Sequence, residues 1–223
     1  MAEFVNQKLQ DANYLKETTL KYKSEMAAVG VTDELMADFE SRIQSVVEKD
    51  SEHREAGNLI HLKTAEQNDA IRQSKAILRK IKTAVKDAFY GNNGIFQEFH
   101  IGMSVNTVKA MLSELPYFKE LTTRHLEKLS GSGIGEADIA EIERCHTLVA
   151  DIDSEQENAK RTRSTAYSER KEALKHLQEI MYRIRKKADI CFADDADKRN
   201  EFRTIIVRKK KSSATGNPPD KGE

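Results

Sequence analysis

The residue pair best suited to metal chemistry is Glu143 and His146, which form an ExxH sequence. Side chains three residues apart lie on one face of a helix, and di-iron bundles hold their metals with this pair. Such a centre needs two pairs and two further glutamates. The equivalent positions of the internal repeat described below hold Glu40 and Ile43, so the second pair is missing. The sequence therefore predicts no metal ligands and no cofactor, and a metal-binding bundle is only the second alternative.

A glycine-rich segment, residues 131–135 (Gly-Ser-Gly-Ile-Gly), precedes a predicted helix. Backbone N–H groups at such a point can bind a phosphate. No Lys-Ser or Lys-Thr follows, and the other repeat shares only the turn glycine. We interpret the segment as a turn between helices.

The tripeptide Asp-Ser-Glu occurs twice, at 50–52 and at 153–155. Paired carboxylates can bind a cation or transfer protons. No histidine or aromatic constellation recurs beside both copies. We therefore expect polar helix faces that form ion pairs with basic segments of the chain.

Four bases near the C-terminus are the predicted contact residues for nucleic acid or another anion: Arg208, Lys209, Lys210 and Lys211. Adjacent bases attract phosphates, but no aromatic residues are interleaved for base stacking. Residues 207–223 are predicted to be a disordered basic tail.

The sequence contains an internal repeat. Sliding the sequence against itself by 103 residues aligns it without gaps and gives 21 identities, which include Gly30 with Gly133 and Phe99 with Phe202. This predicts tandem repeats over residues 1–103 and 104–206. The period is similar to that of spectrin repeats, in which long helices bridge successive bundles.

Each repeat is predicted to be a helical hairpin, with a short helix (2–27 or 104–129) and a very long one (about 33–90 or 136–193). Apolar residues recur at intervals of three and four in both long helices, and Gly30 and Gly133 suit the left-handed turn between helices. The fold class is therefore all-α, elongated and coiled-coil-like. Phe99 and Phe202 are expected to fold back onto a bundle end, and 203–207 to form a short strand.

Charge is divided along both long helices. Residues 33–55 and 136–158 have net charges of −5 and −7, whereas 57–90 and 160–193 have +4 and +6. Unlike blocks meet if the helices pair antiparallel or are staggered. One topology joins 60–90, 104–129 and 136–160 in a three-helix bundle; the other is a four-helix bundle of two hairpins.

Composition limits the function. The formal net charge is zero, charged residues make up 33% and apolar residues 38%. This mixture suits solvated helices and argues against binding to nucleic acid or membranes by bulk charge. There is no signal peptide or transmembrane stretch, and the two cysteines do not suggest a disulfide framework. We expect a cytoplasmic protein.

The sequence thus predicts a structural or interaction protein rather than an enzyme. Its long helices would present faces to a protein partner, including a second copy of itself. The first alternative is an accessory protein that binds nucleic acid or another anion through the basic helix halves and the tail. No small-molecule substrate is inferred.

Overall fold

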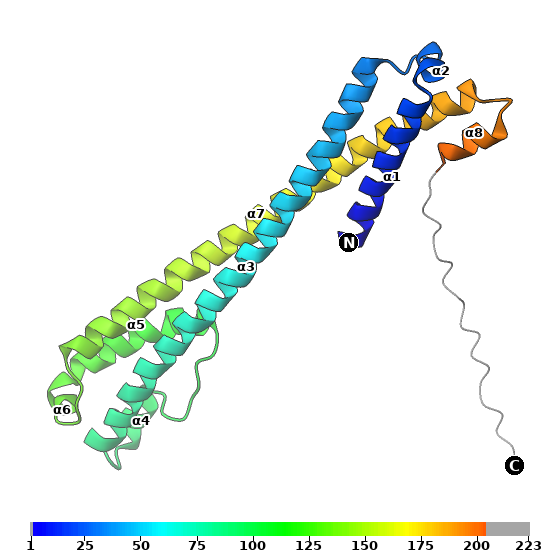
Figure 1. Ribbon diagram of the computed structural model, residues 1–223. Coiled ribbons are helices and arrows are strands. Elements are labelled where there is room, and N and C mark those ends of the chain that lie inside the picture. Colours follow the sequence, from blue (N-terminus) through cyan, green and yellow to red (C-terminus); the bar gives the residue numbers. More distant parts are fainter. Residues whose placement is uncertain (1, 204–223) are drawn as a thin grey trace, which may run out of the picture. The chain divides into compact units, whose positions relative to one another are not determined.

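The computed structural model describes residues 2–203, and the fold of these residues is all-helical (Figure 1). This confirms the predicted all-α class. The eight helices of the described residues are α1 (Ala2–Lys21), α2 (Lys23–Ala28), α3 (Asp33–Ala88), α4 (Asn93–Glu98), α5 (Val108–Arg124), α6 (Leu126–Ser130), α7 (Glu136–Cys191) and α8 (Ala196–Glu201).

The helices repeat with the same offset of 103 residues as the sequence. The long helices α3 and α7 each have 56 residues, and both their first and their last residues are 103 positions apart. Helices α4 and α8 have the same offset. Both long helices are continuous through their polar middles, where Ala56 and Ala159 are buried at equivalent positions.

The turns before the long helices contain the predicted left-handed glycines, and the first also has a predicted N-cap residue. Gly30 and Gly133 have φ angles of +80° and +81°, a region that side chains disfavour. The Thr32 side chain accepts a hydrogen bond from the Leu35 N–H at 3.2 Å and so caps α3.

Each predicted short helix is in fact broken, at Tyr22 in the first repeat and at His125 in the second. These equivalent residues pack their rings on a phenylalanine: Tyr22 lies 5.3 Å from Phe192, and His125 lies 5.4 Å from Phe89, between centroids. Helix α5 also begins four residues later than predicted, because Thr107 accepts a hydrogen bond from the Ala110 N–H and caps it there.

The helices α4 and α8 were not predicted as helices. Asn92 and Asp195 begin them as equivalent N-caps, with side-chain oxygens that accept hydrogen bonds from the backbone three residues on. Both helices end at the phenylalanines expected to fold back, and Phe99 and Phe202 are indeed buried. The long helices stop two residues earlier than predicted.

The chain forms two compact units: unit 1 contains residues up to Asp50 and from Arg170 onward, and unit 2 contains Ser51–Glu169. The core of unit 2 combines the second half of α3, helix α5 and the first half of α7, with Ile81, Phe118 and Ile142 fully buried. Three helical segments therefore form most of this core, as the first of the two topologies predicts, and Phe99, Leu129 and Ile134 complete it.

The core of unit 1 is built in the same way from α1, the first half of α3 and the second half of α7. Leu15, Phe39 and Ile184 are buried there at the positions equivalent to Phe118, Ile142 and Ile81. Each unit thus contains half of the long helix of the first repeat and half of the long helix of the second. The boundaries 1–103 and 104–206 stay a prediction, and residues 204–223 lie outside the described part of the chain.

In unit 2, α3 and α7 run antiparallel. Lys63 Nζ lies 2.7 Å from the Glu155 carboxylate, and Gln67 donates to Asp153 at 3.1 Å. Further along α3, Lys80 pairs with Asp138 near the start of α7. The basic block of one repeat therefore meets the acidic block of the other, which is the complementarity that the charge pattern predicts.

Candidate anion-binding groove

Internal ion pairs account for only some of the bases in α3. Seven lysines and arginines lie between residues 57 and 90. Lys63 pairs with Glu155 and Glu66, Arg72 pairs with Asp69, and Lys80 pairs with Asp138. The remaining four form no ion pair with any residue of the described range 2–203, and they are Lys75, Arg79, Lys82 and Lys86.

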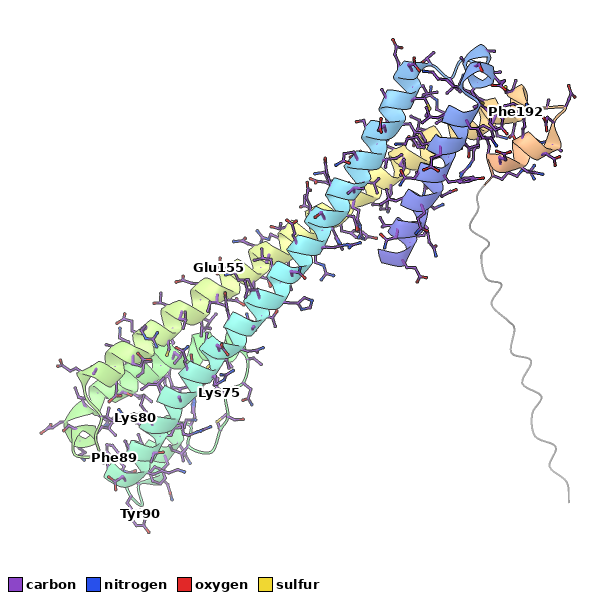
Figure 2. The ribbon with its side chains drawn as sticks, viewed as in Figure 1. Lys75, Lys80, Phe89, Tyr90, Glu155 and Phe192 are labelled. Atoms are coloured by element: carbon purple, nitrogen blue, oxygen red, sulfur yellow. The ribbon has the colours of Figure 1, made fainter. Side chains whose placement is uncertain are left out.

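These four bases gather in one place. They line a groove of about 370 Å³ whose other wall is the segment 103–106 before α5. Their spacing of four, three and four residues puts them within an arc of about 60° on the helix, along about 16 Å of its axis. Lys75 and the ion-paired Lys80 leave α3 on different sides (Figure 2). The bases of this segment that form no ion pair within residues 2–203 therefore all line the groove.

Lys82 holds the two walls together. Its Nζ donates hydrogen bonds to the carbonyl oxygens of His100 and Met103, both at 2.8 Å. Burial lowers the pKa of Lys82, the Glu114 carboxylate opposes this shift, and the Lys86 ammonium adds to it. Lys82 is thus mainly a structural cation, whereas Lys75, Arg79 and Lys86 remain available to a ligand.

The far wall is set by a strained corner at His100. This residue has a φ angle of +46°, and it is the only non-glycine residue with positive φ in the described part of the chain. Its Nδ1 lies 3.0 Å from a Glu114 oxygen, and its ring stacks on Tyr117 at 5.2 Å. Such strain persists only where the surroundings fix it, and it concentrates at functional sites.

A second pocket adjoins the groove and shares Met103 with it. It has a volume of about 370 Å³, and its other lining residues are Asn93, Phe96, Gln97, His100 and Ile101. The Phe96 ring is half-buried. The two hollows together offer cations on one side and a ring with side-chain amides on the other.

The equivalent face of unit 1 lacks this chemistry. Gln178, Tyr182 and Asp189 stand at the positions of Lys75, Arg79 and Lys86. Arg185, equivalent to Lys82, is bound to Asp11 at 2.7 Å and to the Phe202 carbonyl at 3.0 Å. The structural role of this cation is common to both repeats, whereas the three available cations have no basic counterpart at the equivalent positions of unit 1.

The ExxH pair does not form a metal centre in this structure. Glu143 is exposed and pairs with Lys119 Nζ at 2.8 Å, and this hydrogen bond lowers its pKa. His146 is half-buried at the rim, as is its repeat equivalent Ile43. Within residues 2–203, no three side chains from His, Cys, Asp and Glu come together as metal ligands.

The glycine-rich segment 131–135 is a turn, as interpreted. Its amides are already used, because Ser132 and Ile134 donate to the Leu129 carbonyl and Gly135 donates to the Asp138 carboxylate at 3.1 Å. The Ser132 hydroxyl also donates to Asp87. Two carboxylates beside the turn oppose the binding of a phosphate.

The two Asp-Ser-Glu copies serve the packing of α3 on α7. In unit 1, Asp50 accepts a hydrogen bond from Arg170 at 3.0 Å, and both side chains are buried. In unit 2, the equivalent pair is Asp153 with Gln67 at 3.1 Å. These contacts confirm the expected ion pairing for Asp50 and for Glu155, which binds Lys63.

The predicted anion contacts Arg208, Lys209, Lys210 and Lys211 lie outside the described residues. The sequence reasoning missed the groove, although it found the positive block 57–90. The sequence does not show which of the seven bases have acidic partners on the neighbouring helix, and this is why the groove could not be recognised. None of the described helices combines the length and apolar character needed to cross a membrane.

Comparison of the chain with protein-family models, with curated proteins and with solved structures gave no match.

Proposed function

We propose that the protein is a non-catalytic binding protein that holds an anionic partner in the basic groove of unit 2. The observation that carries this proposal is the set of three available cations, Lys75, Arg79 and Lys86, on one helix face. Like charges four residues apart on a helix repel and destabilise it. An anion in the groove relieves this repulsion, so its binding is favoured by the charge pattern itself.

The polar groups with the best catalytic chemistry in the sequence support a non-catalytic role, because they are engaged in packing. Asp50 binds Arg170, Asp153 binds Gln67 and Glu143 binds Lys119. An interaction protein of the cytoplasm, as predicted from the sequence, remains part of this proposal. The acidic surface of another protein is one class of partner that the groove would accept.

A salt-dependent binding assay tests this function. We would measure the anisotropy of three labelled anions with the full chain: a glutamate octapeptide, octathymidylate and tripolyphosphate. We expect at least one to bind at 50 mM salt and to weaken about tenfold or more at 200 mM, because bound counterions are released. The double variant Lys75→Gln/Arg79→Gln should weaken binding by at least tenfold.

Two controls separate the groove from net charge. Arg183 is exposed on α7 of unit 1, and Arg183→Gln should change affinity less than twofold. Replacing the four bases of 208–211 by glutamine measures what the tail contributes. The proposal is wrong if no anion binds, or if Arg183→Gln weakens binding as much as Lys75→Gln alone.

A second candidate function is protein–protein assembly through the outer face of α7 in unit 1. Tyr182 and Ile190 lie two helical turns apart and are 62% and 70% exposed. Lys186 lies between them, with its Nζ 5.6 Å from the Tyr182 ring centroid. If this face binds a second copy, sedimentation should show a dimer that Tyr182→Ser/Ile190→Ser converts to monomer; an unchanged dimer would place the interface elsewhere.

A further inference from the structure

The shape of the groove restricts what can occupy it. The groove holds about 370 Å³. That volume lies in the lower range of small-molecule sites. A compact or slender anion therefore fits better than the acidic helix of a protein partner.

The three available cations suit phosphate groups. Lys75, Arg79 and Lys86 span about 16 Å along α3, so they can contact negative charges in succession. Arginine contacts phosphate with two parallel N–H donors, and lysine contacts it as a point charge. The opposite wall adds the Ser104 hydroxyl and the Asn106 amide, which are exposed and lie close enough to bond each other at 3.2 Å.

The adjoining pocket suits a flat heterocycle. Phe96 offers an aromatic face, and Asn93 and Gln97 offer amides that can both donate and accept hydrogen bonds. Nucleobases stack on aromatic side chains, and amides bond their edges. The shared residue Met103 is 65% exposed and lies at the boundary between the two hollows.

We propose that unit 2 binds a nucleotide, with its phosphates on Lys75, Arg79 and Lys86 and its base on Phe96 in the adjoining pocket. This inference rests on the proposed anion-binding function and names its ligand. The nucleotide can be a free nucleoside triphosphate or one residue of a single strand, since both place phosphate beside a base. The His100 corner, tied to Glu114 and braced by Lys82, fixes the wall that both hollows share.

Four probes test the ligand class with the full chain: ATP, octathymidylate, tripolyphosphate and a glutamate octapeptide. We expect ATP or octathymidylate to bind at least tenfold more tightly than tripolyphosphate, because only they carry a base. Which of the two binds better identifies the source. With three phosphate contacts, octathymidylate should show a slope of about −2.1 for log affinity against log salt, which corresponds to a loss of about 18-fold from 50 to 200 mM.

The base contact is tested by Phe96→Leu, which keeps apolar packing but removes the aromatic face. A second variant, Gln97→Ala, removes an amide from an exposed site without touching the core. Phe96→Leu should lower the affinity for the base-bearing probe to that of tripolyphosphate and leave tripolyphosphate binding unchanged. Phe4→Leu, at an exposed phenylalanine of unit 1 outside both hollows, is the matched control and should change neither.

The outcomes separate this inference from the function on which it rests. Equal binding of tripolyphosphate and nucleotide, with no effect of Phe96→Leu, overturns the nucleotide inference but leaves anion binding in place. Binding of the glutamate peptide alone does the same and points to a protein partner. If no probe binds, both proposals fail.

Discussion

The Arg185 side chain offers the sharpest test of how unit 1 is held together. It joins three elements, since it lies on α7, donates to Asp11 of α1 at 2.7 Å and donates to the Phe202 carbonyl after α8 at 3.0 Å. Asp11 is 1% exposed, and its second oxygen has no hydrogen-bond partner among the described residues. Arg185→Ala therefore leaves a buried carboxylate without its charge partner.

The magnitude follows from burial. Removing one partner of a buried ion pair costs about 3–5 kcal/mol. The Arg185 side chain is 25% exposed, so water entering the vacated space solvates Asp11 in part. We therefore expect the lower end, about 3 kcal/mol of unfolding free energy in unit 1.

Hydrogen exchange measures this loss unit by unit. A change of about 3 kcal/mol accelerates exchange of the α1 amides roughly 150-fold if they exchange through opening of unit 1. The α5 amides of unit 2 should keep their protection. Arg183→Ala, which removes an exposed arginine from the same helix, should change neither.

A double-mutant cycle with Asp11→Asn completes the test. Arg185→Ala should cost less in that background, by about 2 kcal/mol, because the buried charge is already gone. Unchanged α1 protection in Arg185→Ala, or equal loss from α5, would refute the reasoning.

Two further predictions concern titration and thiol chemistry. Hydrogen bonds from Lys21 and Tyr22 lower the pKa of Glu201 below its ordinary value of 4.5; this stabilisation is present above that pH and is lost as pH falls through the folded-state pKa. The urea midpoint of Glu201→Gln should therefore approach that of the native chain between pH 7 and 3, and a constant difference would contradict this. Burial raises the pKa of both thiols, but Cys145 is fully buried whereas Cys191 is half-buried and more accessible to a reagent. Iodoacetamide at pH 8 should label Cys191 at least tenfold faster, as mass spectrometry of the peptides would show; equal rates would mean that unit 2 opens readily.

Much of the fold follows from the sequence alone. The self-alignment at 103 residues predicts that α3 and α7 are equivalent, and the structure gives them equal lengths at that offset. Gly30 and Gly133 mark their turns because a left-handed residue is needed there. Local signals also existed for α4 and α8, since Asn92 and Asp195 are N-cap residues, but a helix of six residues has too little apolar periodicity to be recognised.

The candidate site was decided by the tertiary structure. The sequence shows seven bases between 57 and 90, and nothing local distinguishes Lys80 from Lys82. The antiparallel pairing of α3 with α7 puts Asp138 opposite Lys80, and the turn at His100 puts the segment 103–106 opposite Lys82. Coulombic neutralisation acts over a few ångströms, so which charges remain for a ligand depends on contacts between residues far apart in the chain. The sequence thus determined which segments are helical and which carry charge, and the packing of those helices decided which charges are left unpaired.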